Sequence, residues 1–270
     1  MSPIALTIAG SDCSGGAGIQ ADLKTFSALG VYGASVIAAL TAENTRGVQA
    51  FEVASPAIIR AQIDSVFDDL DVRAVKIGML GNAAAAVAVA EGLRAGCRAP
   101  VVLDPVMVAA SGDALLDEGA ERTLIRELFP LADLITPNLG EAARLLGTDM
   151  AEDEDAMGEQ ARKLHAMGPK AVLVKGGHGA GAEAVDLLWD GSEMTRLAAP
   201  RVATRHGHGT GCTLSAAIAA GLAKGAALGA AVAEAKAYLT EALAQADTLQ
   251  IGSGSGPVHH FYALWPADRS

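Results

Sequence analysis

The sequence is short of cysteine and of positive charge, and each shortage excludes a class of protein. Its three cysteines, Cys13, Cys97 and Cys212, form no Cys-x-x-Cys pair. An odd number without framework spacing indicates reduced thiols, as in a cytoplasmic protein. Acidic residues outnumber basic ones by 31 to 20, which gives a formal net charge of −11. Nucleic acid and anionic membranes are therefore not expected to bind the surface as a whole.

Long hydrophobic runs are missing as well, so no membrane partner is expected. The apolar N-terminal stretch MSPIALTIAG is short and has no basic n-region. It predicts a first strand rather than a signal peptide. The alanine-rich stretch that begins at Ala83 is interrupted by Glu91 and Arg94, short of a membrane span. Hydrophobic residues make up 51% of the chain, which favours a folded globule with a sizeable core.

Strand-like and helix-like segments alternate along the chain. The strand-like runs are PIALTIAG, SVIAAL, AVKIG, PVVLD, DLITP and AVLVKGG, and helical patterns at 18–30, 56–70 and 138–147 lie among them. This alternation predicts one α/β domain over residues 1–270, with a mainly parallel sheet covered by helices on both faces. A hairpin turning at Asp190–Gly191 and alanine-rich helices near 210–223 and 229–246 are expected to follow. Ligands should bind beyond the carboxyl ends of the strands.

The segment HGTGCTLSAAIAAGLAKG, which begins at His208, predicts an anion-binding loop. Gly209 and Gly211 let successive backbone N–H groups point the same way at the start of a helix. Cys212 falls in the first turn, where the pKa of a thiol is expected to drop toward neutrality, so that it can accept a proton. Two alternatives stay open: a glycine-rich turn with a small buried cysteine, and a metal site formed with His206 and His208.

A second glycine-rich loop, GSDCSGGAGIQADLKTFSALG, begins at Gly10 and matches neither a nucleotide-binding P-loop nor a dinucleotide fingerprint. Asp12 or Asp22 is a candidate for hydrogen bonding to a ligand. The alternative is that Ser14 or Asp12 caps the helix that follows.

Four more polar residues are expected at strand ends. Asn138 and Glu141 are three apart at a helix start, which suits a hydrated Mg²⁺ near phosphates. The same spacing is also that of a capping box. Lys175 ends a buried strand, where a cation needs an anion nearby, and Asp104 is an acid at another strand end. An anion-binding loop, a base, a cation and acids together suit phosphoryl transfer.

Several motifs together resemble a known family. AGSDCSGGAGIQADLKTFSALGVYG, NTRGV, KIGML, VVLDPVM, LITPN, VKGGH, HGTGCTLSAAIA and GPVHHF closely resemble the hydroxymethylpyrimidine/phosphomethylpyrimidine kinases of thiamine biosynthesis, in the ribokinase-like superfamily. The match runs nearly end to end. The resemblance implies a three-layer α/β/α sandwich, ATP and Mg²⁺ as cofactors, a small pyrimidine substrate and a homodimer.

The resemblance also implies roles for individual residues. Gly209, Thr210 and Gly211 would frame the anion hole, and Cys212 would stand at the base position that an aspartate fills in many sugar kinases. The nucleotide phosphates would contact Lys175, Lys236 and Asn138. Asp104 and Glu141 would hold the metal. The pyrimidine would lie near Gly10, Ala17, Asp22, Glu43, Met79 and Val106.

Two positions depart from the family pattern. Cys13 stands where the family usually has proline, and Glu43 stands where it usually has glutamine. Glutamine offers one donor and one acceptor, whereas an ionised glutamate offers acceptors alone. Hydroxymethylpyrimidine and its monophosphate are the first expected substrates. Alternatives are a related kinase of pyridoxal type or for another pyrimidine, and a pyrimidine-binding protein without catalysis. Glu43 could also face solvent and pair with Arg46.

Overall fold

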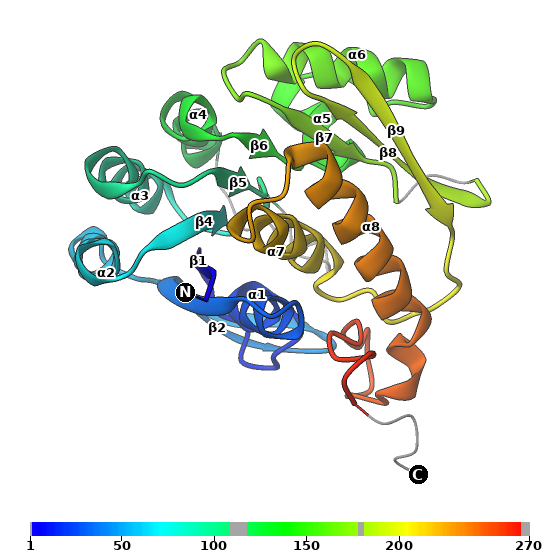
Figure 1. The fold of residues 1–270 in the computed structure, drawn as a ribbon, viewed down its shortest axis with the longest axis horizontal. Coiled ribbons are helices and arrows are strands. Elements are labelled where there is room, and N and C mark those ends of the chain that lie inside the picture. Colours follow the sequence, from blue (N-terminus) through cyan, green and yellow to red (C-terminus); the bar gives the residue numbers. More distant parts are fainter. Residues whose placement is uncertain (1, 108–117, 178–180, 266–270) are drawn as a thin grey trace.

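The computed structural model describes residues 2–107, 118–177 and 181–265, and its centre is one nine-stranded sheet (Figure 1). The strand order is β3-β2-β1-β4-β5-β6-β7-β8-β9. Neighbours from β2 to β7 run parallel, while β3, β8 and β9 are antiparallel to the strands beside them. The strands are β1 (Ile4–Gly10), β2 (Tyr32–Asn44), β3 (Gly47–Val53), β4 (Val72–Ile77), β5 (Val101–Leu103), β6 (Leu134–Ile135), β7 (Val172–Lys175), β8 (Glu183–Trp189) and β9 (Met194–Pro200).

Helices cover both faces of the sheet, and each face has its own hydrophobic core (Figure 1). One layer holds α2 (Pro56–Asp69), α3 (Ala83–Gly96), α4 (Glu118–Glu127), α5 (Leu139–Leu146) and α6 (Glu154–His165). The other holds α1 (Gly18–Ala28), α7 (Thr210–Ala223) and α8 (Leu228–Ala244). Short 3₁₀ helices lie at Phe129–Leu131 and Ala246–Thr248. The expected three-layer sandwich with a mainly parallel sheet is confirmed.

Local predictions hold where the hydrophobic pattern is strong. Each of the six strand-like runs contains a strand, and α7 and α8 occupy the two alanine-rich stretches. The hairpin turn at Asp190–Gly191 joins β8 to β9, and the Asp190 carboxylate accepts hydrogen bonds from the N–H groups of Ser192 and Glu193.

The end of β2 differs from the prediction. The apolar run ends at Leu40, but β2 continues to Asn44 and pairs with β3, which the sequence did not predict. A bulge lies between Ala42 and Glu43. Most of β3 is exposed, and its apolar alternation is short and changes phase between Ala50 and Phe51, so it gives no clear strand signal. Glu43 therefore lies inside a strand rather than after one.

No helix among the described residues is suited to crossing a bilayer. Across the three described ranges, every helix is too short or too polar for a membrane span.

Candidate active site

Two neighbouring pockets open at the carboxyl end of the parallel strands. We call the first the loop pocket; it has a volume of about 390 Å³ and lies between the loop after β1 and the start of α7. The second, the hairpin pocket, has a volume of about 420 Å³ and lies among β8, β9 and α8. Both pockets are lined by Asn138, Lys175, Gly207, Thr210 and Gly211. Two ligands could therefore meet at the start of α7.

Most of the residues that the sequence singled out line these pockets. The loop pocket takes in Gly10, Ala17, Glu43, Met79, Asp104, Val106, Glu141, Gly209 and Cys212, besides the shared residues. Lys236 lines the hairpin pocket. A larger, open depression of about 970 Å³ near Asp247 and Gln250 contains His206 of the alternative metal site, which is thus separated from His208 and Cys212 in the loop pocket, and no other predicted site residue.

Asp22 is the exception, and its expected place in the pocket is corrected. Its side chain is fully buried and lines neither pocket. One carboxylate oxygen accepts a hydrogen bond from Thr7, at 2.6 Å, and from Nζ of Lys76, at 2.8 Å. The position of Asp22 on the inner face of α1 directs it into the core beside β1 and β4, so it forms a buried ion pair.

The start of α7 has the backbone geometry of an anion-binding loop. Gly209 adopts φ +79°, and a Cβ atom there would collide with the carbonyl oxygen of Gly16, so only glycine fits. Thr210 departs from the expectation, because its N–H and its hydroxyl both donate to the carbonyl of Gly207, at 3.2 and 2.6 Å. In this conformation both groups already have an acceptor within the loop.

The expected fall in the pKa of Cys212 is wrong for this structure. Burial raises the pKa of the thiol to about 11, although Lys76 and the N–H of Gly18 act to lower it. The helix N-terminus was the sequence-based reason for a low pKa. Loss of hydration outweighs it here, because a charged thiolate is poorly solvated in this enclosed position.

The two lysines are paired with aspartates. Nζ of Lys175 lies 2.8 Å from Asp104, which also accepts a hydrogen bond from Thr136 at 2.9 Å. Burial opposes the charge on both partners, yet their attraction raises the pKa of Lys175 and lowers the pKa of Asp104. Nζ of Lys236 lies 2.6 Å from Asp186. Each lysine is thus held in place at the pocket wall by an aspartate.

Asn138 and Glu141 form the capping box that was the structural alternative for this pair. The Asn138 side chain accepts from the Glu141 N–H at 2.9 Å, and the Glu141 carboxylate accepts from the Asn138 N–H at 2.8 Å. Burial raises the pKa of Glu141 to about 7. Both residues also line the loop pocket beside Asp104. Carboxylate oxygens of this kind fit Mg²⁺, so capping and metal binding are compatible.

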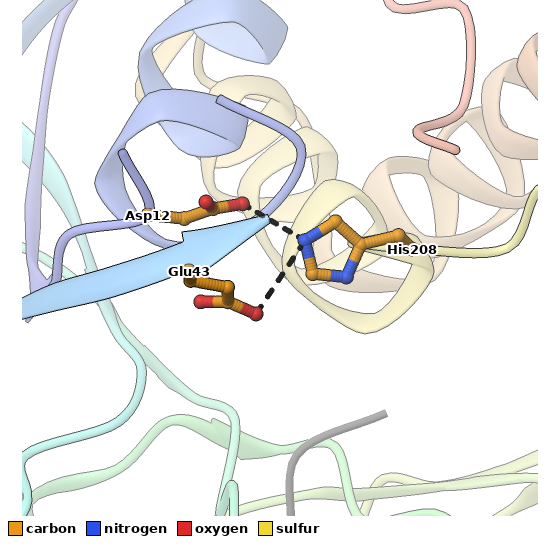
Figure 2. Close-up of side chains that lie close together, drawn as sticks. All are labelled: Asp12, Glu43 and His208. Carbon is orange, nitrogen blue, oxygen red and sulfur yellow. Dashed lines mark hydrogen bonds and ion pairs between the residues drawn. The ribbon is translucent and has the colours of Figure 1, made fainter. Parts of the chain in front are cut away.

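A cluster of Asp12, Glu43 and His208 was not predicted as a unit (Figure 2). Nε2 of His208 lies 2.8 Å from Oδ2 of Asp12 and 3.7 Å from Oε1 of Glu43. His208 and Asp12 are 196 positions apart, so no local pattern could have paired them. The solvent-facing alternative for Glu43 is wrong, because its side chain is 12% exposed and faces the loop pocket.

Asp12 also organises the glycine-rich loop, but the alternative that Asp12 or Ser14 caps the helix is wrong, because Ala17 is the N-cap of α1 and no side chain caps it. The Asp12 carboxylate accepts hydrogen bonds from the N–H groups of Ser14, Gly16 and Ala17. Burial would raise the pKa of Asp12, but these bonds and the one to His208 lower it. Ligand atoms of the cluster lie within 4.8 Å of one another, a spacing that suits a cation. Oδ2 of Asp12 already accepts three hydrogen bonds, however, so a proton fits this cluster better than a metal ion.

Comparison with known proteins places this site in a family. The model of the phosphomethylpyrimidine kinase family matches residues 12–259. The chain belongs to this family. It is 62% identical over 266 residues to the hydroxymethylpyrimidine/phosphomethylpyrimidine kinase of Rhizobium meliloti (strain 1021), covering 98% of this chain and 99% of the relative.

Solved structures of phosphomethylpyrimidine and pyridoxal kinases have the same fold. Phosphomethylpyrimidine kinase from Clostridium difficile 630 matches with a TM-score of 0.79 and 46% identity, covering 89% of this chain and 99% of that one. Bacillus subtilis pyridoxal kinase, solved as an ADP complex, matches with a TM-score of 0.88 and 38% identity, covering 96% and 98%.

Proposed function

We propose that this member of the phosphomethylpyrimidine kinase family transfers the γ-phosphoryl group of ATP to 4-amino-5-hydroxymethyl-2-methylpyrimidine, and then phosphorylates the monophosphate. The observation that carries the proposal is the pair of pockets that meet at Gly211, with Lys175 shared between them. Two substrates placed on either side of one anion-binding loop have the geometry that phosphoryl transfer requires. The names of close relatives supply the substrate.

In this proposal the loop pocket binds the pyrimidine and the hairpin pocket binds ATP. Lys175, Lys236 and Asn138 contact the phosphates, and the ADP complex of the pyridoxal kinase supports a nucleotide site in this fold. Asp104 and Glu141 would hold Mg²⁺, which neutralises phosphate charge when bound. The lysines are held by Asp104 and Asp186 before any ligand arrives, so little rearrangement is needed.

Cys212 remains the candidate acceptor of the hydroxyl proton. With a pKa of about 11 it is mainly a neutral thiol in the ligand-free chain. The loose transition state of phosphoryl transfer depends chiefly on positioning and charge neutralisation. We therefore assign charge neutralisation and positioning of the phosphates to Lys175 and the α7 N-terminus, and the proton transfer to Cys212.

A second candidate function is phosphorylation of pyridoxal. The match to a pyridoxal kinase and the carboxylate of Glu43 in the loop pocket favour it, because a carboxylate can accept a hydrogen bond from a protonated ring nitrogen.

The deciding experiment measures ADP release with each ring compound as the phosphoryl acceptor. Hydroxymethylpyrimidine and its monophosphate should give the highest kcat/KM, and pyridoxal a lower value. The reverse order would make pyridoxal phosphorylation the main activity. If ADP is released at a rate that no ring compound increases, both kinase assignments are ruled out. If a ring compound binds and no ADP is released, the chain acts as a pyrimidine-binding protein without catalysis.

The family resemblance further leads us to propose a homodimer, and the cysteine pattern leads us to propose a cytoplasmic location. Cys13, Cys97 and Cys212 are free thiols in this structure, which agrees with a reducing compartment.

A further inference from the structure

Lys76 and Asp22 form an ion pair inside the core, next to the loop pocket. Both side chains are 0% exposed, and Nζ of Lys76 lies 2.8 Å from Oδ2 of Asp22. Neither side chain lines the loop pocket or the hairpin pocket. Oδ2 also accepts a hydrogen bond from Thr7, while Oδ1 has no hydrogen-bond partner among the described residues. Because desolvation cancels much of the attraction between buried charges, stability alone is a weak explanation for this pair.

The alternation of side chains along β4 directs Lys76 toward α1 and α7. Ala74 packs in the core beneath these two helices, whereas Val75 and Ile77 pack in the core on the other face of the sheet. Lys76 alternates with them and therefore shares the face of Ala74. α7 packs against β4 and against α1, which carries Asp22 on its buried side (Figure 1). The ammonium thus lies in the layer that the start of α7 covers.

Gly78 marks the position of the ammonium more closely. A Cβ atom added to Gly78 would lie 2.8 Å from Nζ of Lys76 and 3.1 Å from Cβ of Ala9. Ala9, Met79 and Cys212 all line the loop pocket. The ammonium therefore lies behind the wall of the pocket that carries the thiol, and not in the pocket itself.

Lys76 is the charged group that acts most strongly on the Cys212 thiol. Burial raises the pKa of Cys212 to about 11, and the charge of Lys76 lowers it. The charges of Asp22 and Asp104 each raise it by less than Lys76 lowers it. The N–H of Gly18, the first residue of α1, also favours the thiolate. The ammonium thus offsets part of the effect of burial on this thiol.

Other titratable groups lie around the same thiol. Lys175, on β7, also interacts with the charge of Cys212, but it is paired with Asp104 at 2.8 Å and lines both pockets. The remaining titratable side chains of the loop pocket are Asp12, Glu43, Glu141 and His208. Lys76 differs from all of these because it lies outside both pockets. Its charge therefore acts on groups of the protein rather than on a bound ligand.

We propose that the buried ammonium of Lys76 stabilises the thiolate form of Cys212, and that Lys76 is thereby a positioning residue for the proton-transfer step. The role in phosphoryl transfer rests on the proposed function, whereas the effect on the thiol does not. In that step the thiolate takes the proton of the acceptor hydroxyl and the hydroxyl oxygen bonds to the γ-phosphorus of ATP. The bond from this phosphorus to the ADP oxygen breaks, and nothing is oxidised or reduced.

The small thiolate population makes this support important. With a pKa of about 11, about one chain in a thousand carries the thiolate at pH 8. Each further unit of pKa lowers that population about tenfold. Burial would lower the pKa of Lys76 itself, but the charge of Asp22 raises it. Asp22 therefore keeps the ammonium charged beside the thiol.

The rate at which iodoacetamide alkylates Cys212 tests the proposal without nucleotide, Mg²⁺ or ring compound. The thiolate is the reactive form, and Cys212 is partly exposed in the loop pocket. Mass spectrometry of peptides separates its alkylation from that of Cys13 and Cys97. At pH 8 the Lys76→Met variant should react about 10- to 100-fold more slowly than the wild type, because its thiolate population is smaller.

A second variant removes both charges of the pair. Lys76→Met leaves Asp22 buried without its partner, whereas Lys76→Met/Asp22→Asn is neutral and keeps an acceptor for Thr7. The double variant should also react slowly. A site that is merely loosened would expose the thiol and react faster, so the sign of the change separates charge from packing. Lys163→Met removes an exposed lysine paired with Glu159 on α6 and should react like the wild type. Thermal unfolding of each variant checks that it is folded.

ADP formation connects the thiol to the reaction. Both Lys76 variants should lower kcat at pH 8 by about the factor seen in alkylation and change the KM for the pyrimidine little, since Lys76 lines neither pocket. Alkylation of the double variant at the wild-type rate or faster overturns the proposal, as does slow alkylation with a normal kcat. If alkylation is slowed but the wild-type protein transfers no phosphoryl group, the effect of Lys76 on the thiol stands and the kinase function is rejected, so the two can fail separately.

Discussion

At the scale of single residues, Cys212 shows how burial can reverse an expectation drawn from a helix end. The thiol lies in the first turn of α7, as expected, yet its pKa is raised to about 11. The sequence shows the helix but not the enclosure, which comes from β4 and α1. Lys76 and Asp22, both fully buried, form an ion pair near Cys212, besides the pair of Lys175 and Asp104. No sequence motif predicted it.

Replacing Cys212 separates proton transfer from packing. Cys212→Ala should lower kcat by on the order of 10²–10⁴, the usual contribution of a general base, with little change in ring affinity. Steady-state kinetics with calorimetric binding would measure both. Cys97→Ala is the control, because Cys97 is a free cysteine at the end of α3 and lines neither pocket. A kcat near the wild-type value in Cys212→Ala would reduce the thiol to a packing role.

Lys175 should act on the nucleotide more than on the ring. Charge-assisted hydrogen bonds contribute about 1.5–3 kcal/mol, so Lys175→Ala should raise the KM for ATP by about 10- to 100-fold and the KM for the pyrimidine by less. Lys170→Ala, an exposed lysine paired with Asp133 before the same strand, is the control. A change confined to the pyrimidine KM would contradict the assignment of Lys175 to the phosphates.

At the scale of secondary-structure elements, the contact between Asp12 and His208 joins the loop after β1 to the start of α7. The pKa of His208 is raised in the folded chain, so its imidazolium stabilises the fold below an unfolded pKa of about 6.5. This stabilisation is lost as pH rises through the raised pKa, at about 1.4 kcal/mol for each unit of difference.

Urea unfolding between pH 6 and pH 9 should therefore show a falling free energy of unfolding in the wild-type protein. His208→Asn should be less stable at pH 6 and should show a smaller fall. His165→Asn, which alters α6 and keeps His208, should follow the wild type. Equal pH dependence in the wild type and in His208→Asn would mean that the imidazolium does not stabilise the joined loops.

Elements with a buried, periodic face could be predicted from the sequence, and exposed ones could not. The strand-like runs and the two alanine-rich helices carry core residues such as Ile8, Val174 and Ile218, whose periodicity is visible locally. In β3 only the backbone pairing with β2 defines the strand. The site was predicted where glycines or strand ends mark it, and missed where distant segments meet, as at His208.

At the scale of the whole molecule, the sheet runs unbroken through nine strands with a core on each face. We propose from this continuity that the described chain is one domain and unfolds as a unit. The two pockets lie where both layers meet the same sheet edge, so the site depends on the complete fold rather than on a detachable part.

The β2–β3 hairpin is where we expect the proposed homodimer to form. Leu40 and Phe51 on this hairpin are 57% and 44% exposed, and large exposed apolar side chains on an edge hairpin favour a partner. The same hairpin carries Glu43 and Val48 of the loop pocket, so loss of the dimer should also weaken ring binding.

Phe51→Lys should shift the molecular mass measured by light scattering from dimer to monomer and lower kcat/KM for the pyrimidine. Met150→Lys alters an exposed apolar residue between α5 and α6, away from this hairpin, and should leave both unchanged. A wild-type protein that is a monomer would exclude the homodimer. A Phe51→Lys variant that stays a dimer and binds the ring with normal affinity would place the dimer contact elsewhere.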